Sequence, residues 1–397
     1  MRSQGANRDG VVVSPAHDRA TGSLDDRGPL RFGILGVDVH LTTDDDDLGR
    51  FFSHAYRLFP PDDGGARLDL EAVLHPASGR AFARAGETLV DLTKSPSPAN
   101  HAFLMLLGAI MDAIDGSFMV HGAAVSDAGR GVILAGPAFA GKSTLVVELL
   151  RRGCAFLSDD AAPLERVGGR LLPFPRAVGL RKTESSPRPD ASIPEEGLLE
   201  LPHRWLVDPS ALGAALLGAP VAPDFLFYLD PGGWSSGGES EPPVYEIALA
   251  HEPAKLRDEL RIIGAISIEE LPAHPFPGLV ASFRASLGLA QGLVDLQRRH
   301  RESVLFLEQK RPPLMRSEGA PIVTPVPVSE LLIPIVRDLL NRGDDGRLMR
   351  GLEGRVAPVL LEIGALLQRT RAYRVSSGSP GEVAGTIMNI VHEGVVR

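Results

Sequence analysis

The stretch from Gly136 to Ser143 constrains this chain more than any other, because it fits the phosphate-loop motif G-x-x-x-x-G-K-[ST] at every fixed position. The apolar residues 131–135 before it predict a short buried strand, and residues 144–153 after it predict a helix. A strand, loop and helix in this order direct backbone N–H groups and a helix N-terminus at one point, which favours a phosphate. A glycine-containing turn with a chance lysine would not explain the flanking elements. We therefore expect a nucleotide site.

The motif also assigns tasks to individual side chains. Lys142 would reach the β- and γ-phosphates of a bound nucleotide, and the hydroxyl of Ser143 would ligate Mg²⁺. The residues expected to contact the nucleotide are Gly136, Pro137, Ala138, Phe139, Ala140, Gly141, Lys142, Ser143 and Thr144.

Two adjacent carboxylates follow the next apolar segment. Residues 154–158 predict a short strand, and Asp159 and Asp160 come directly after it. Nucleotide enzymes hold Mg²⁺ with an acidic residue at such a strand end. A second carboxylate can accept a proton from an attacking hydroxyl group, as a general base must. Aspartate is also common in turns that end strands, but the phosphate-loop motif immediately upstream favours a functional pair.

Several basic residues allow two interpretations. His121 interrupts an apolar strand predicted over residues 117–125, and on spacing alone a satisfied core histidine is favoured over a functional one. Arg176, Arg181 and Lys182 follow in an extended, proline-containing segment. Each of these three could meet phosphates or an acidic substrate, and each could equally belong to a solvated basic edge.

Local patterns predict further helices. The acidic run from Asp44 to Asp47 could hold a metal, but it precedes an amphipathic helix over residues 48–59. Because acidic residues at the start of a helix interact favourably with its dipole, the helix-start interpretation is favoured. Helices are also expected over about 253–263 and 277–292.

Composition excludes several classes of function. The net charge of −9 argues against a general surface for nucleic acids or anionic membranes, since both need clustered Lys and Arg. Cys154 is the single cysteine, which excludes an internal disulfide and a cysteine-rich zinc site, and its apolar setting predicts a packed thiol. No apolar run reaches the roughly 18 residues that span a bilayer, and no apolar signal segment begins the chain. We therefore expect a cytoplasmic protein without nucleic-acid or membrane partners.

The length of 397 residues allows one large domain or two medium ones. Residues 1–28 are polar and aperiodic and predict a disordered lead-in. Residues 29–116 predict an N-terminal α/β part, and residues 117–310 a core that binds the nucleotide. Residues 311–397 predict a mostly helical C-terminal part.

Taken together, three features resemble the catalytic core of HPr kinase/phosphorylase, and more closely the HPr-kinase-related proteins found beside peptide-modification genes. They are His121 before the phosphate loop, the loop itself, and the Asp159–Asp160 pair after it. His121 stands 21 positions before Lys142, and Asp160 stands 18 positions after it, as in that family's pattern. The close match covers about 40 residues. The resemblance reverses the interpretation of His121 in favour of function.

This resemblance implies an α/β fold with a mixed sheet and flanking helices, a P-loop kinase core of the HPr kinase and phosphoenolpyruvate carboxykinase type. It also implies ATP- and Mg²⁺-dependent transfer of a phosphoryl group to a serine hydroxyl of a peptide or protein. Asp160 would be the base, and His121 would position it or the γ-phosphate. Lys142 would neutralise the transferring group, and Ser143 with Asp159 would hold Mg²⁺.

The chain also departs from the family. Residues 137–140 lack a further glycine that HPr kinases usually carry, and Thr144 replaces a glutamate. Their Glu-x-Arg-Gly-x-Gly segment is not found, and Glu184 is a candidate for its glutamate by position alone. These departures weigh against phosphorylase activity and against HPr as the substrate, and favour a serine of a ribosomally made peptide.

Alternatives stay open at this point. A small hydroxylated metabolite could be the acceptor, and GTP or pyrophosphate could replace ATP as the donor. A nucleotide-binding switch or recruitment module without transfer activity is a further alternative. HPr kinases assemble as hexamers, so self-association is also left open.

Overall fold

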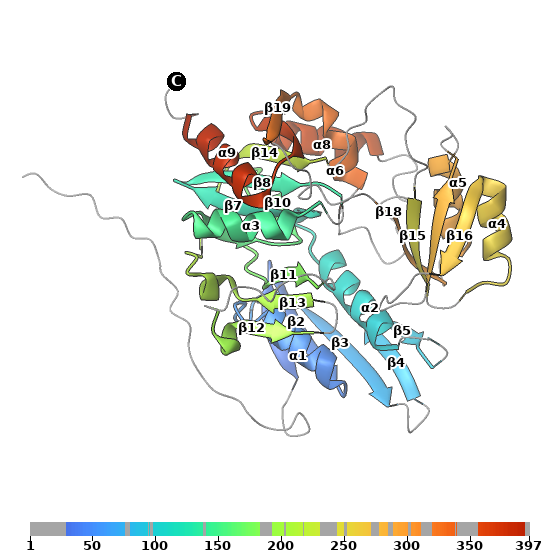
Figure 1. The fold of residues 1–397 in the computed structure, drawn as a ribbon. Helices are drawn as coiled ribbons and strands as arrows, with labels where there is room; N and C mark the ends of the chain where they lie inside the picture. The colour runs from blue at the N-terminus through green and yellow to red at the C-terminus, as the bar shows by residue number, and fades with distance from the viewer. Residues whose placement is uncertain are drawn as a thin grey trace, which may run out of the picture.

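The computed structural model describes sixteen stretches of the chain, and the other residues, which include Ala138, Phe139, Glu184 and the predicted lead-in 1–28, lie outside this description. The described stretches are 29–75, 80–93, 95, 98–137, 140–182, 193–201, 204–216, 218–230, 244–249, 252–270, 278–284, 289–300, 303–310, 320–337, 339 and 356–393. They form a mixed α/β structure with several sheets and flanking helices, which confirms the predicted class (Figure 1). No helix among them is long and apolar enough to cross a membrane.

A six-stranded mixed sheet lies at the centre. In spatial order its strands are β19 (Ile322–Val326), β20 (Arg371–Ser377), β14 (Pro223–Leu229), β8 (Arg130–Ala135), β7 (Gly122–Asp127) and β9 (Ala155–Ser158). Strands β20, β14 and β8 are parallel, while β7 is antiparallel to both of its neighbours, β8 and β9. The carboxyl ends of β8, β9, β14 and β20 and the start of β7 therefore meet at one edge of the sheet. We call this the carboxyl edge.

Helices cover both faces of this sheet because its strands are apolar on both sides. Helices α3 (Lys142–Arg151) and α9 (Pro380–Glu393) cover one face. The other face is covered by α6 (Leu332–Arg337), α8 (Val356–Leu366) and the strand pair β6 (Ser117–Val120) and β10 (Ala162–Glu165). Successive residues of β8 show the alternation: Val132 and Leu134 belong to the first core, and Ile133 belongs to the second. The thiol of Cys154 is buried 3.3 Å from the sulfur of Met388, and burial raises its pKa to about 12, so the predicted packed thiol is confirmed.

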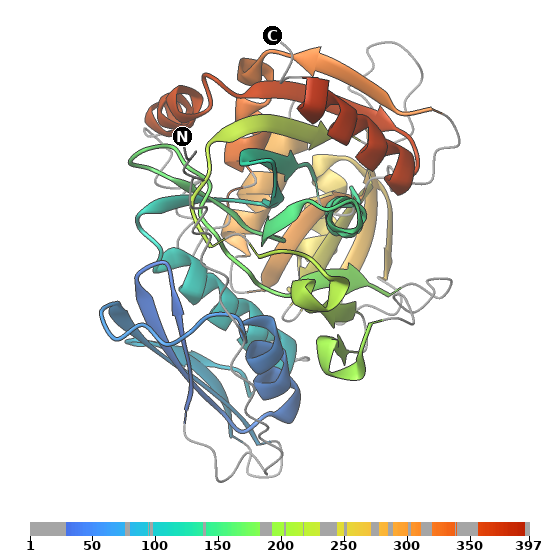
Figure 2. The same cartoon turned by 90° about the vertical axis from the view of Figure 1, so that its left-hand side faces the viewer.

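An N-terminal unit packs beside the central sheet (Figure 2). It contains β1 (Leu30–Ile34), β2 (Val37–Thr43), α1 (Asp46–Ala55), β3 (Ala66–His75), β4 (Arg80–Ala85), β5 (Thr88–Asp91) and α2 (Pro98–Asp112). The side chain of Asp45 caps α1, and Asp46 and Asp47 lie in its first turn, which confirms the helix-start interpretation of the acidic run. The core of this unit extends to Phe174 and Leu206, which lie in segments that follow the Asp159–Asp160 pair.

Those segments form a small three-stranded sheet. Its strands are β11 (Val178–Arg181), β13 (Arg204–Val207) and β12 (Leu198–Glu200), and the short 3₁₀ helix η4 (Pro209–Leu212) follows β13. Strand β13 is central and pairs antiparallel with both neighbours. In this pairing Gly179 stands opposite Leu206, and Arg181 stands opposite Arg204.

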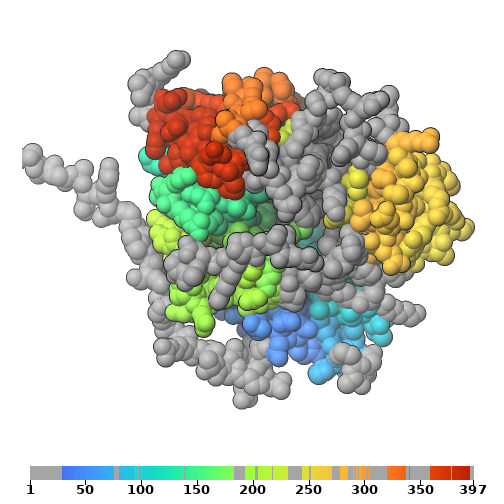
Figure 3. All heavy atoms as spheres, in the orientation of Figure 1, coloured from blue at the N-terminus to red at the C-terminus, as the bar shows by residue number. Residues whose placement is uncertain are grey.

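The described residues between 244 and 310 form a further unit with its own core, seen as a separate lobe in the space-filling view (Figures 1 and 3). Its elements are β15 (Val244–Leu249), α4 (Leu256–Ile263), β16 (Ala265–Glu270), β17 (Gly278–Phe283), α5 (Leu289–Arg299) and β18 (Val304–Lys310). The antiparallel order β16-β17-β15-β18 is the split β-α-β-β-α-β arrangement. The helix expected over 277–292 is therefore wrong for residues 278–283. This apolar run suits either element, and pairing with β15 and β16 on its two sides makes it a strand.

Because this unit has its own core, we expect it to unfold separately from the central sheet. Phe283→Ala should destabilise residues 244–310 by about 3–5 kcal/mol, because it empties a fully buried site. Amide hydrogen exchange should accelerate in β15 to β18 and stay unchanged in β8 and α3, which belong to other cores. Equal acceleration in all of these elements would show that the cores unfold as one.

Candidate functional site

The phosphate-loop motif lies at the carboxyl edge, between β8 and α3, and its two fixed glycines have distinct structural reasons. A Cβ atom on Gly136 would lie 2.6 Å from the carbonyl oxygen of Leu229 in β14, so only glycine allows this close approach. Gly141 is the N-cap of α3 and has a φ of 87°, which glycine adopts without strain. Together they turn the chain from a buried strand directly into a helix whose N-terminus points to this edge.

The side chain of Lys142 lies against the backbone of the loop. Its Nζ donates hydrogen bonds to the carbonyl oxygens of Gly136 at 2.9 Å and Pro137 at 3.1 Å. The side chain is 7% exposed, and a buried ammonium needs such acceptors. Phosphate oxygens placed at the loop would offer the ammonium stronger, charged acceptors than these carbonyls.

Ser143 and Asp159 connect the start of α3 with the end of β9. The hydroxyl of Ser143 donates to Asp159 Oδ1 at 3.0 Å, and the backbone N–H of Gly179 donates to Oδ2 at 3.0 Å. A hydroxyl and a carboxylate beside a phosphate loop are the donors that Mg²⁺ uses together with phosphate oxygens and water. The pair therefore fits Mg²⁺ as a partner of the nucleotide. In the described parts of the chain, no group of three or more His, Cys, Asp or Glu residues could hold a metal.

The two carboxylates differ in protonation. Burial, followed by the negative charge of Asp160, raises the pKa of Asp159 to about 7, although the bonds from Gly179 and Ser143 oppose the shift. Asp159 is 1% exposed, whereas the side chain of Asp160 is 37% exposed. Burial would also raise the pKa of Asp160, but four nearby basic side chains outweigh it and lower that pKa. In order of effect they are Arg176, His121, Arg204 and Lys142.

Asp160 has an uncommon backbone conformation. Its φ is 64°, in the left-handed region that residues other than glycine rarely adopt. Such strained residues persist where their surroundings hold them, and they cluster at functional sites. Among the residues that the structure describes, Arg176 forms an ion pair with this carboxylate, with its Nη2 3.6 Å from Asp160 Oδ2.

His121 lies directly before β7, at the same edge. Gly122 pairs with Ala135 across the sheet, so His121 stands level with the first residue of the phosphate-loop motif. The histidine is half-buried and near enough to Asp160 to influence its pKa. The structure thus brings His121, Lys142, Ser143 and the Asp159–Asp160 pair together at the carboxyl edge.

The basic residues of the following segment separate into two environments. Arg176 is 3% exposed and faces Asp160, so the solvated-edge interpretation is wrong for this residue. Arg181 is exposed, and Lys182 pairs with Glu200 at 2.5 Å. Sequence reasoning missed Arg204, which reaches the site because β13 pairs with β11, and no local signal marks that pairing.

A scan of the chain against models of protein families finds no match, and a search among curated proteins finds none either.

The raised pKa of Asp159 predicts how Mg²⁺ binding depends on pH. The ion needs the ionised carboxylate, so affinity should fall as pH drops below about 7, by up to about tenfold per unit for one displaced proton. Calorimetric titration of Mg²⁺ into the nucleotide complex between about pH 5.5 and 8.5 measures the slope. Asp159→Asn is the control, because its remaining slope reports the nucleotide's own phosphates. Equal slopes in both proteins would contradict the prediction.

Proposed function

We propose that this chain is a Mg²⁺- and ATP-dependent kinase that transfers the γ-phosphoryl group to a serine hydroxyl of a peptide or protein. One observation carries the proposal. Lys142 and Ser143 of the phosphate-loop motif meet two carboxylates at the carboxyl edge, one buried against Ser143 and the other partly exposed beside basic groups that lower its pKa. The first arrangement suits a nucleotide with its metal, and the second suits a reacting hydroxyl group.

The nucleotide half of the site uses the loop and the start of α3. Backbone N–H groups and the helix N-terminus would hold the phosphates, and Lys142 would exchange its two carbonyl acceptors for phosphate oxygens. Ser143 and Asp159 would hold Mg²⁺. When bound, Mg²⁺ would offset charge on the phosphate oxygens.

The acceptor half uses Asp160. The serine oxygen would bond to the γ-phosphorus while the bond from that phosphorus to the β–γ bridging oxygen breaks, which leaves ADP. Asp160 would orient the serine hydroxyl and take its proton, and His121 would position Asp160 or the γ-phosphoryl group. A lowered pKa suits this task, since phosphoryl transfer is largely dissociative and needs orientation more than a strong base.

An ionised carboxylate beside the phosphates favours an enzyme over a pure nucleotide binder. Its charge repels phosphate oxygens and so weakens nucleotide binding. A protein that only binds a nucleotide gains nothing from such a group, whereas a kinase can use it to orient the acceptor hydroxyl. The choice of serine in a peptide or protein rests on the resemblance to HPr-kinase-related proteins. The missing Glu-x-Arg-Gly-x-Gly segment favours a kinase without phosphorylase activity.

Asp160→Asn should lower kcat for transfer by about 10²- to 10⁴-fold, because the amide cannot accept the proton. The assay uses γ-labelled ATP, Mg²⁺ and serine-containing peptides encoded by neighbouring genes, with products identified by mass spectrometry. Nucleotide affinity should not fall, since Lys142 and the loop are unchanged and the repulsion between Asp160 and the phosphate oxygens is removed.

Glu148→Gln is the matched control. It makes the same acid-to-amide change on α3, but at an exposed pair with Arg151, and should leave transfer unchanged. Tight nucleotide binding by the wild type, without transfer or hydrolysis, would support the switch instead. Transfer that persists in Asp160→Asn would show that another residue is the base.

A further inference from the structure

Arg176 faces the proposed reaction site from inside the protein. Nη2 lies 3.6 Å from Asp160 Oδ2, but the residue is only 3% exposed, so substrate does not reach it. Arg176 can therefore act on the reaction only through the groups it faces, first of all through Asp160, its ion-pair partner.

The N-terminal unit holds this guanidinium group. Its central carbon lies 5.8 Å from the ring centroid of Phe51 and 5.9 Å from that of Tyr56, within the range of a cation–π interaction. The ring of Tyr56 is itself stacked on Phe32, with centroids 4.7 Å apart. Within the described part of the chain, Arg176 Nε and the Tyr56 hydroxyl have no hydrogen-bond partner. The described contacts of the Arg176 guanidinium group are therefore the aromatic faces and the charge of Asp160.

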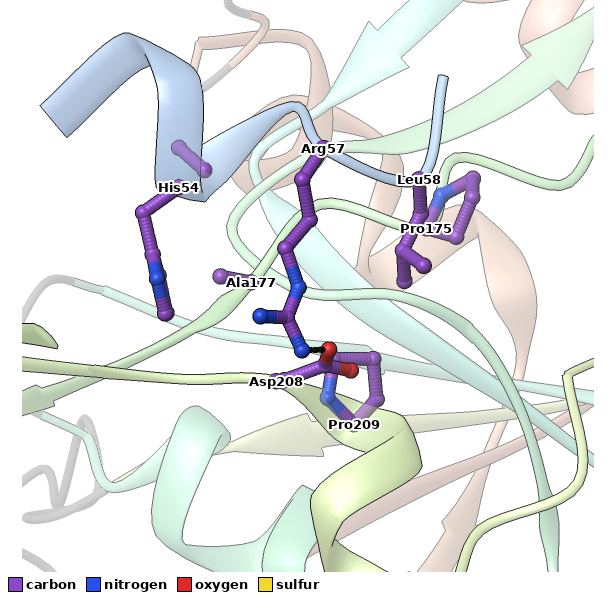
Figure 4. A pocket seen from close by; sticks show the side chains of 8 residues that line it. His54, Arg57, Leu58, Pro175, Ala177, Asp208 and Pro209 are labelled. Atoms are coloured by element: carbon purple, nitrogen blue, oxygen red, sulfur yellow. Dashed lines mark ion pairs between the residues drawn. The ribbon is translucent and has the colours of Figure 1, made fainter. Parts of the chain in front are cut away.

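The end of α1 is attached to the segments on both sides of this contact. The backbone N–H of Ala177 donates to the carbonyl of Ala55 at 3.0 Å, and His54 Nε2 lies 3.1 Å from the carbonyl oxygen of Leu206. Arg57 forms an ion pair with the buried Asp208, shown in Figure 4 at a small hollow between α1 and η4. The N-terminal unit is thus fixed to the residues next to Arg176 and to strand β13.

We infer that Arg176 is a positioning residue for the proposed phosphoryl transfer, held by the N-terminal unit so that it keeps Asp160 in its left-handed conformation facing the acceptor. The inference rests on the proposed function. The strained backbone of Asp160 needs a compensating contact, and Arg176 supplies it as the described ion-pair partner. Phe51 and Tyr56 of the N-terminal unit thereby help to position Asp160, although Arg176 itself lies outside that unit in sequence.

Arg176→Met tests this by removing the charge while keeping most of the side-chain volume. We expect kcat to fall about 10- to 100-fold, because a small displacement of a reacting group costs rates of this size. KM for ATP and nucleotide affinity should stay within about threefold, since Arg176 contacts neither the loop nor Ser143. Arg176→Lys, which keeps the charge, should recover part of the lost rate.

A double-mutant cycle separates positioning from general damage. In an Asp160→Asn background, Arg176→Met should cost less than about threefold, because the group it acts through has already been removed. Single-turnover transfer of labelled phosphate keeps these slow rates measurable. Equal fold losses in both backgrounds would overturn the inference.

Arg57→Met is the matched control for the joint between units. It removes the ion pair with Asp208 and should lower the melting temperature, because Asp208 is left buried without that partner. It should leave kcat within about twofold, since Arg57 does not contact Asp160. If Arg57→Met lowers kcat as much as Arg176→Met under conditions where both are folded, the rate loss does not depend on the contact between Arg176 and Asp160, and the specific role of Arg176 would be overturned.

The remaining outcomes are also distinct. If Arg176→Met does not fold, Tyr56→Leu replaces it: this change removes one aromatic face and should lower kcat in the wild-type background but not in Asp160→Asn. An active wild type with full kcat in Arg176→Met would overturn only the role of Arg176. A wild type that transfers no phosphoryl group to any acceptor would overturn the proposed function itself.

Discussion

The hydrogen bonds to Asp159 join the elements on which the candidate site depends. One comes from Ser143 in the first turn of α3, and the other from the backbone of Gly179 in β11. A buried carboxylate requires such partners, because an unpaired one costs several kcal/mol. Through this one side chain, the phosphate-loop motif, the end of β9 and the small sheet that carries Arg204 are held in a fixed arrangement.

The burial of Asp159 also gives the two adjacent carboxylates different pKa values. Like charges this close do not ionise equally, and the enclosed Asp159 keeps its proton up to a higher pH. Asp160 stays ionised because basic groups from separate parts of the chain surround it. Arg176 follows the pair in sequence, Arg204 arrives with β13, and His121 precedes β7. The electrostatic difference between neighbours is therefore a property of the tertiary structure.

The dependence on tertiary structure decides which features of the fold and the site can be predicted from the sequence. The strand, loop and helix around Gly136–Ser143 and the position of the Asp159–Asp160 pair could be predicted, since each depends on local pattern and turn chemistry. The burial of Arg176 and the arrival of Arg204 could not, because both depend on contacts with segments distant in sequence. For the same reason residues 278–283 form a strand where their apolar pattern predicts a helix: pairing with β15 and β16 decides their conformation. The roles of Asp160 and His121 remain predictions.

The unit of residues 244–310 lies between β14 and β20 in the chain, although these two strands are direct neighbours in the central sheet. Phe225 pairs with Arg371, so the separate lobe must emerge from the ribosome before this ladder closes. Strands β7, β8 and β9 come from one short stretch and can associate early, while β20 is synthesised more than 140 residues after β14. A nascent chain would thus carry the phosphate-loop motif for a long interval with one side of its sheet incomplete. Premature termination after β14 would leave a strand edge exposed to aggregation rather than a smaller working protein.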